Sequence, residues 1–161
     1  MSKKSKTSTH WREKLEKEDH SKIVVVPDRM AKRVGHGTMY IPRPLDVDSV
    51  MREVKKGKLI RPVEIRERLV RDNRVNVTCP LTTGIFIRIV AEAAEEDLSN
   101  GRKRVTPYWR VVRDDGSLFD RFPGGVQAQA KRLKTEGHSI EQAVGKKAPK
   151  VRDFERRLIK L

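Results

Sequence analysis

The chain has 161 residues, of which 36% are hydrophobic and 5% aromatic, so its length fits one domain with tails rather than a large two-domain protein. Its 37 lysines and arginines exceed 22 acidic residues, giving a formal net charge of +15. That excess favours a polyanionic partner, nucleic acid first, although a basic protein with no specific ligand has the same composition. The single cysteine, Cys79, excludes an internal disulfide and every multi-cysteine zinc pattern.

Further classes of protein are disfavoured by what the sequence lacks. The four histidines are scattered without ligand spacing, so we expect no metal site and no cofactor. There is no phosphate-binding glycine loop and no nucleophile elbow. Nothing resembles a signal peptide, and no apolar run approaches a membrane span. We therefore expect a cytoplasmic protein without membrane contact, associated with the nucleoid if the source is bacterial.

The first 45 residues predict little regular structure. Residues 1–21 are rich in Lys, Ser, Glu and Thr, which is typical of a flexible basic tail. A short helix around 11–18 would let Trp11 either stay in solvent or dock on the domain. Lys22–Val26 predicts a strand ended by Pro27. Because Gly35–Pro44 is full of glycine and proline, we expect an irregular arm over residues 22–45.

Residues 46–140 predict the central domain. Asp46 or Asp48 can cap a helix ending at Val54, Leu59-Ile60 reads as a brief strand, and Pro62 opens a second helix to about Arg71. A third helix, 80–97, follows, with Thr78 as its expected cap. Helix, strand, helix and helix, followed by extended segments, match a winged helix-turn-helix, a mainly α fold with a small β wing.

The third helix is the one that this fold offers to nucleic acid. At 100° per residue, we expect a core face of Ile85, Phe86, Ile89, Val90 and Ala93. The opposite, exposed face would contain five residues: Gly84, Ile87, Arg88, Ala91 and Glu95. Small side chains would allow close approach to another surface, with Arg88 projecting from the middle. An ordinary amphipathic helix with a generous apolar side remains the alternative.

The remaining segments complete the expected domain. Residues 100–104 form a basic turn, 106–113 an extended segment and 114–116 a turn within the wing. Gly125–Glu136 predicts a helix closed by Gly137. Residues 141–161 are expected to form a basic linker and a C-terminal helix that docks on the core. The inward side of this helix would contain Val151, Phe154, Leu158 and Leu161.

Several short motifs in a fixed order carry a resemblance to a known family. They are Ile87-Arg88-Ile89-Val90, Pro107-Tyr108-Trp109-Arg110-Val111, Gly116, Phe122-Pro123-Gly124-Gly125 and Glu136-Gly137. The set resembles the winged-helix half of the alkylguanine-DNA alkyltransferases, the methylated-DNA–protein cysteine methyltransferase family. Those enzymes carry Ala-Arg-Ala-Val, Pro-Cys-His-Arg-Val, a glycine turn, an aromatic residue before Gly-Gly, and Glu-Gly. The resemblance covers about residues 46–137 and implies the fold of the alkyltransferase C-terminal domain.

The departures from the family pattern argue against an enzyme. The alkyl-accepting cysteine falls on Tyr108 and the activating histidine on Trp109. A phenol, whose ordinary pKa is near 10, is a poor acceptor for an alkyl group. The pattern is similar to the alkyltransferase-like proteins, which bind alkylated DNA without repairing it and flag it for excision repair. The family's nucleotide-rotating tyrosine falls on Pro62, which weakens the expectation of efficient base flipping.

The resemblance implies roles for particular residues. Arg88 would enter the minor groove and fill the gap left by an extruded base. Phe122 would form a wall of the lesion pocket, and Glu136 would hold that pocket together, while Arg110 braces the core. Tyr108 and Trp109 would either line the pocket or fill it with their rings.

The predicted contacts to DNA extend around Arg88. On the helix they are Thr83, Gly84, Ile87 and Ala91, and in the basic turn Arg102, Lys103 and Arg104. The expected partners are double-stranded DNA, plain or alkylated, and excision-repair proteins, with the protein as a monomer. The alternative is a basic RNA- or ribosome-associated protein on the same fold. An enzyme has little support, because Glu136 stands alone near the pocket.

Overall fold

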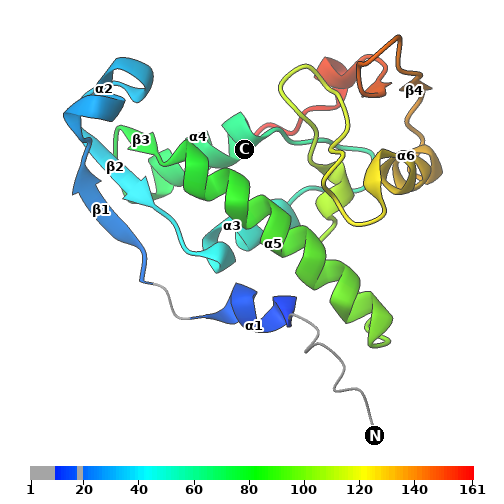
Figure 1. The fold of residues 1–161 in the computed structure, drawn as a ribbon, viewed down its shortest axis with the longest axis horizontal. Coiled ribbons are helices and arrows are strands. Elements are labelled where there is room, and N and C mark those ends of the chain that lie inside the picture. The colour runs from blue at the N-terminus through cyan, green and yellow to red at the C-terminus, as the bar shows by residue number, and fades with distance from the viewer. Residues whose placement is uncertain (1–9, 18–19) are drawn as a thin grey trace, which may run out of the picture.

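The computed structural model describes residues 10–17 and 20–161, so most of the predicted flexible tail lies outside the described residues. The molecule is mainly helical, with a small sheet at one end (Figure 1). The helices are α1 (Trp11–Glu16), α2 (Asp28–Val34), α3 (Pro44–Arg52), α4 (Pro62–Asn73), α5 (Pro80–Ser99) and α6 (Gly125–Thr135), with 3-10 helices η1 (Tyr108–Arg110) and η2 (Phe154–Arg157). The strands are β1 (Lys22–Val25), β2 (Thr38–Ile41), β3 (Val77–Thr78), β4 (Ile140–Glu141) and β5 (Lys150–Val151).

The N-terminal sheet corrects the expectation of an irregular arm. β1 is the predicted strand and pairs antiparallel with β2, which pairs parallel with β3. The prediction that Gly35–Pro44 is irregular was wrong, since β2 lies within it, and α2 was not foreseen. The Thr38 amide donates to Asn76 Oδ1 at 2.9 Å, and the Cys79 amide to the Tyr40 carbonyl at 2.9 Å. These partners lie far along the chain, so local sequence could not reveal the strand.

Helices α3 and α4 begin in the same way. Each has proline at its first position, and an acidic side chain three residues after the N-cap accepts the N-cap amide. The Arg43 amide donates to Asp46 at 2.8 Å, and the Arg61 amide to Glu64 at 2.7 Å. The predicted inward side of the first helix is confirmed, with four buried residues: Val47, Val50, Met51 and Val54.

Helix α5 begins where it was predicted, but Thr78 does not cap it. The N-cap is Cys79, whose side chain caps no amide, and Pro80 takes the first helical position. The Thr78 hydroxyl donates instead to the Arg66 carbonyl at 3.0 Å. Thr78 belongs to β3, so its side chain joins the strand to α4 and not to the helix that follows.

Helix α1 docks on the domain, and Figure 1 shows it beside α5. Its Leu15 is 2% exposed within the core shared with α3 and α5. The Trp11 amide donates to Glu96 at 2.8 Å, and the Arg12 guanidinium pairs with Asp97 at 3.1 Å. The N-terminal helix is therefore attached by both packing and charge to the helix that organises the molecule.

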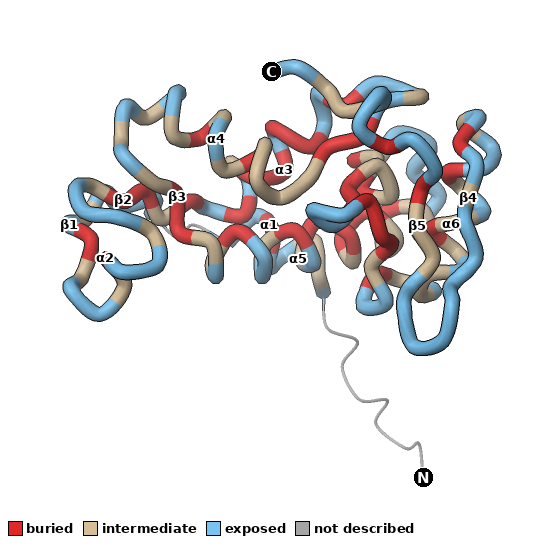
Figure 2. Tube along the Cα trace, turned by 90° about the horizontal axis from the view of Figure 1, so that it is seen from above, coloured by how far each residue is buried: buried red, intermediate tan, exposed pale blue. Residues whose placement is uncertain are grey.

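The C-terminal part packs against the turn at residues 114–116. Residues 106–113 were expected to be extended, but Tyr108–Arg110 form η1, and only Val111 bridges to Ile60. The turn at 114–116 is present, with Gly116 at a φ of +83°. A Cβ on Gly116 would lie 2.3 Å from the Phe154 ring of η2. The C-terminus therefore docks as predicted, but through β5 and η2 in place of a helix. Figure 2 shows buried positions running from β2 and β3 past α3 and α5 towards α6.

We expect Leu15→Ala to lower the free energy of unfolding by about 2–4 kcal/mol, because it opens a cavity between α1, α3 and α5. Leu81→Ala is the matched control, since Leu81 is 72% exposed, and it should change stability by less than about 0.5 kcal/mol. Urea denaturation followed by circular dichroism measures both. Equal stability of Leu15→Ala and the parent would mean that α1 does not dock.

Candidate nucleic-acid interface

The exposed face of α5 is a narrow stripe in the first half of the helix. Leu81, Gly84, Ile85 and Arg88 share it, at the spacing of one helix side. Leu81 is 72% and Ile85 51% exposed, both high for large apolar side chains. Gly84 has open space where a Cβ would lie. Arg88 therefore projects from a surface that is otherwise apolar or small.

The rotation of α5 differs from the prediction. Thr83, Ile87 and Ala91 were expected among the DNA contacts, but they are 0%, 2% and 0% exposed. Ile85, which was expected to point inward, is exposed. The buried side of α5 packs against α1, α3 and η1, and its small alanines allow these elements to come close. These three residues therefore belong to the core. The face of α5 that is exposed to a partner contains Gly84 and Arg88.

A groove of about 810 Å³ runs along this stripe. The floor is α5, one wall is α1, and the opposite wall is the loop 119–122 that precedes α6. Among the residues that line it are Trp11, Lys14, Leu81, Gly84, Ile85, Arg88, Phe119, Arg121 and Phe122. Because Arg88 lies on the floor between the walls, it is the central cation of the groove.

The rim of the groove is cationic. The Lys14 ammonium lies 4.5 Å from the centre of the Trp11 ring. Arg113 lies 4.7 Å from the centre of the Phe119 ring and pairs with Asp120 at 3.1 Å. Burial raises the pKa of Glu92, one turn after Arg88, above its usual value, although the Arg88 guanidinium opposes this shift. Positive charge over aromatic and apolar surface suits a nucleic acid.

The basic turn lies beyond the C-terminal end of α5. Arg102, Lys103 and Arg104, for which phosphate contacts are predicted, are exposed. The Arg102 guanidinium also lies 3.8 Å from Asp97, the buried carboxylate that Arg12 binds. None of the three residues lines the groove. They form a separate cationic surface.

The four residues predicted for a lesion pocket pack into one another. Tyr108 is 1% exposed, and its ring meets Trp109 and Phe122 edge-on, with centres 5.4 and 5.3 Å apart. Phe122 in turn stacks on Phe119 at 4.5 Å. Of the two alternatives, these contacts agree with rings that fill the space. Phe122 alone of the four lines the groove, on its outer wall.

Glu136 holds this aromatic cluster to the core. Its carboxylate accepts hydrogen bonds from Trp109 Nε1 at 2.8 Å and from Arg110 Nε and Nη2 at 3.0 and 2.8 Å. Burial acts to raise the pKa of Glu136, but the bonds from Arg110 and Trp109 outweigh it and hold that pKa below its usual value. Arg110 also binds the Val54 carbonyl, so it braces the core as expected.

Tyr108 has the wrong environment for a nucleophile. Burial and its hydrogen bond to Glu95 Oε1, 2.7 Å long, raise the pKa of its phenol far above the ordinary value. The phenolate needed for attack on an alkyl group is therefore disfavoured at neutral pH. Within residues 10–17 and 20–161, no three His, Cys, Asp or Glu side chains gather as metal ligands. In the same ranges no helix is both long and apolar enough to span a membrane.

Several residues of the groove were missed by sequence reasoning. Trp11 and Lys14 belong to a segment that reads as a basic tail, and only the isolated tryptophan marked it out. Phe119 and Arg121 lie within three residues of Phe122, which was identified. Two aromatic residues separated by two charged residues, Phe119-Asp120-Arg121-Phe122, could have indicated a second aromatic on the same wall.

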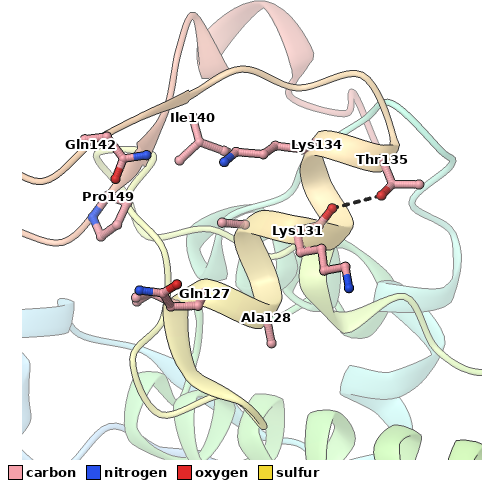
Figure 3. Close-up of a pocket in the computed structure, with 10 residues that line it drawn as sticks. Gln127, Ala128, Lys131, Lys134, Thr135, Ile140, Gln142 and Pro149 are labelled. Atoms are coloured by element: carbon pink, nitrogen blue, oxygen red, sulfur yellow. Dashed lines mark hydrogen bonds between the residues drawn. The ribbon is translucent and has the colours of Figure 1, made fainter.

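A second cavity, of about 600 Å³, lies between α6 and residues 140–149 (Figure 3). Lys131 and Lys134 contribute to it, and the Lys134 side chain extends towards Ile140. The Thr135 hydroxyl is used within the helix, donating to the Lys131 carbonyl at 2.9 Å. No aromatic residue lines this cavity, so it lacks the stacking surface that distinguishes the groove on α5.

The order α3, α4 and α5, followed by η1, the turn at 114–116 and α6, makes a mainly helical fold that is shared with an alkyltransferase-like protein. The chain is similar to S. pombe Atl1, an alkyltransferase-like protein solved in complex with damaged DNA containing O6-carboxymethylguanine, with a TM-score of 0.52 and 21% sequence identity. The likeness covers 73% of this chain and 94% of that chain, and at this identity it shows the fold. No protein-family model matches the sequence, and no curated protein matches it.

We expect Glu136→Gln to lower the free energy of unfolding at pH 7 by about 1.5–3 kcal/mol, because it removes charged hydrogen bonds to Trp109 and Arg110. Since the pKa of Glu136 is lowered on folding, this contribution is present above the unfolded pKa and is lost as pH falls through the folded pKa. The difference from the parent should therefore shrink below about pH 4.5.

Denaturation midpoints between pH 3 and 8 measure this difference. Glu155→Gln, at an exposed position in η2, is the control and should leave stability within about 0.5 kcal/mol. A penalty for Glu136→Gln that does not change with pH would contradict the assignment to an ionised carboxylate.

Proposed function

We propose that this protein is a non-catalytic DNA-binding protein of the alkyltransferase-like type, which docks the exposed stripe of α5 against the minor groove. The observation that carries the proposal is Arg88, an exposed guanidinium at the centre of a cationic groove. A helix that enters the minor groove needs room beside the inserted side chain, and Gly84, one turn before Arg88, leaves such room. The net charge of +15 supports a polyanionic partner.

The apolar side chains of the stripe support minor-groove contact. Minor-groove proteins insert apolar wedges between base steps and add arginine or lysine contacts. Leu81 and Ile85 are exposed on the same side as Arg88 and supply such wedges. Lys14 and Arg121 on the rim are placed to meet the flanking phosphates, and the turn 102–104 would add further contacts.

The damage-recognition part of the proposal has a different basis. The fold is shared with a protein that was solved on damaged DNA, and Tyr108 in the acceptor position is unsuited to alkyl transfer. We propose that the protein binds duplex carrying an alkylated guanine more tightly than plain duplex, as a monomer, and leaves removal of the lesion to excision-repair proteins. Phe122 and Phe119 would contact the displaced base at the groove wall.

We expect Arg88→Ala to weaken binding to duplex DNA at least about fivefold, because the loss of such an arginine contact costs on the order of 1–3 kcal/mol. It should also reduce the salt slope of binding by about one. Fluorescence anisotropy of a labelled duplex at several salt concentrations measures both quantities. Arg33→Ala removes the same charge from exposed α2, outside the groove, and is the matched control. If the two variants bind alike, docking through Arg88 is wrong.

We expect a duplex with O6-alkylguanine to bind at least severalfold more tightly than its plain counterpart, with no transfer of the alkyl label to protein. Competition anisotropy gives the affinities, and mass spectrometry of the incubated protein detects transfer. Equal affinities would remove damage recognition and leave a general DNA binder. Preference for structured RNA over both duplexes would favour the ribosome-associated alternative. Detection of the alkyl group on the protein after incubation would overturn the non-catalytic assignment.

A further inference from the structure

A small cavity lies well away from the DNA-binding groove, between the turn that follows α6 and the C-terminal η2. It encloses about 170 Å³, and its lining includes His138, Ser139, Arg152, Asp153, Arg156 and Arg157. None of these residues lines the groove on α5. In Figure 1 the red helical turn of the C-terminal segment lies at the top of the view, whereas α1, which lines that groove, lies below α5.

The lining carries an excess of positive charge. Three guanidiniums stand against the single carboxylate of Asp153. Arg152 has a partner of its own, since its Nε lies 3.4 Å from a carboxylate oxygen of Glu141. Arg156 and Arg157 form no ion pair with any residue of the ranges 10–17 and 20–161. Two cations thus line the same small space without a described ion-pair partner.

The backbone around the cavity is fixed. The Arg157 carbonyl accepts from the Leu59 amide at 2.8 Å, and the Arg152 amide donates to the Ser139 carbonyl at 2.9 Å. The amide of His138 donates to the Leu133 carbonyl at 3.0 Å at the end of α6. The cationic side chains therefore extend from held positions on both sides of the cavity.

His138, which also lines the cavity, has a buried ring nitrogen without a hydrogen-bond partner in the described part of the chain. The residue is 7% exposed, and its Nε2 is buried with no hydrogen-bond partner among the described residues. Burial and the nearby Arg157 lower the pKa of this histidine, while Glu136 acts against the shift and Arg110 with it. A neutral imidazole still offers one N–H donor. Buried polar atoms are normally paired, so the unpaired ring nitrogen leaves part of the hydrogen-bonding capacity of His138 unused beside two guanidiniums that form no described ion pair.

We propose that this cavity binds a phosphate group, held by the guanidiniums of Arg156 and Arg157, the Ser139 hydroxyl and the His138 ring. Arginine is well suited to phosphate because its planar fork matches two oxygens at once. The volume equals several waters of about 30 Å³ each, which fits one hydrated phosphate group and excludes a whole nucleotide. The group could be free phosphate or a phosphate of the DNA backbone, and the experiment distinguishes these sources.

The test is a titration of the ¹⁵N-labelled full chain with inorganic phosphate at constant ionic strength. We expect the His138 ring nitrogens and the Ser139 amide to shift saturably, and sodium chloride at the same ionic strength to leave them in place. The double variant Arg156→Gln/Arg157→Gln should weaken the response at least about tenfold, because charged hydrogen bonds to phosphate are lost. Lys32→Gln/Arg33→Gln removes two adjacent exposed charges from α2 and should respond as the parent does.

A linear, non-saturating response, or the same affinity in the Arg156→Gln/Arg157→Gln variant, would overturn the site and leave a buried water as the partner of His138. If the backbone of DNA supplies the phosphate, the same variant loses more duplex affinity than Lys32→Gln/Arg33→Gln. If phosphate binds free, the two variants keep equal duplex affinity. Arg88→Ala should titrate with phosphate as the parent does, so failure of the proposed DNA docking would not be confused with failure of this site.

Discussion

The packing of one side of α5 determines what the rest of the molecule can do. Thr83, Ile87 and Ala91 lie on that side and are almost completely buried. Since the helix is rigid, burying this side fixes the direction of every other side chain on it. Arg88 and Gly84 are thereby turned outward, between α1 and the loop that precedes α6. The cationic groove is a consequence of how the core packs, and a rotation of α5 by one residue would remove it.

The second organising feature is the aromatic cluster beside α5. The rings of Tyr108 and Trp109, and of Tyr108 and Phe122, meet edge-on at the position that the sequence resemblance assigns to a reactive centre. The Glu136 carboxylate ties this cluster to Arg110 and through it to the core. A buried phenol bonded to Glu95 gives packing and a hydrogen bond where a thiol would give chemistry. This arrangement gives the cluster a structural role beside α5.

Local signals in the sequence predicted the helices well and the faces of α5 poorly. Pro62 and Pro80 mark helix starts because proline is favoured at the first position, and that preference needs no tertiary partner. The stretch 85–90 is apolar at five of six positions, so periodicity could not choose which side is buried. Strand β2 depends on pairing with distant β3, and the groove wall depends on docking of α1. Neither long-range contact leaves a local pattern.

The most direct test of the central claim is to map where duplex DNA touches the protein. Backbone amide chemical shifts of the labelled chain, recorded with and without a duplex, report the contacted surface residue by residue. The account predicts the largest changes at Gly84, Arg88 and the loop 119–122, and none at Arg33 on α2. Changes concentrated on α2 or α6, with α5 unaffected, would contradict it.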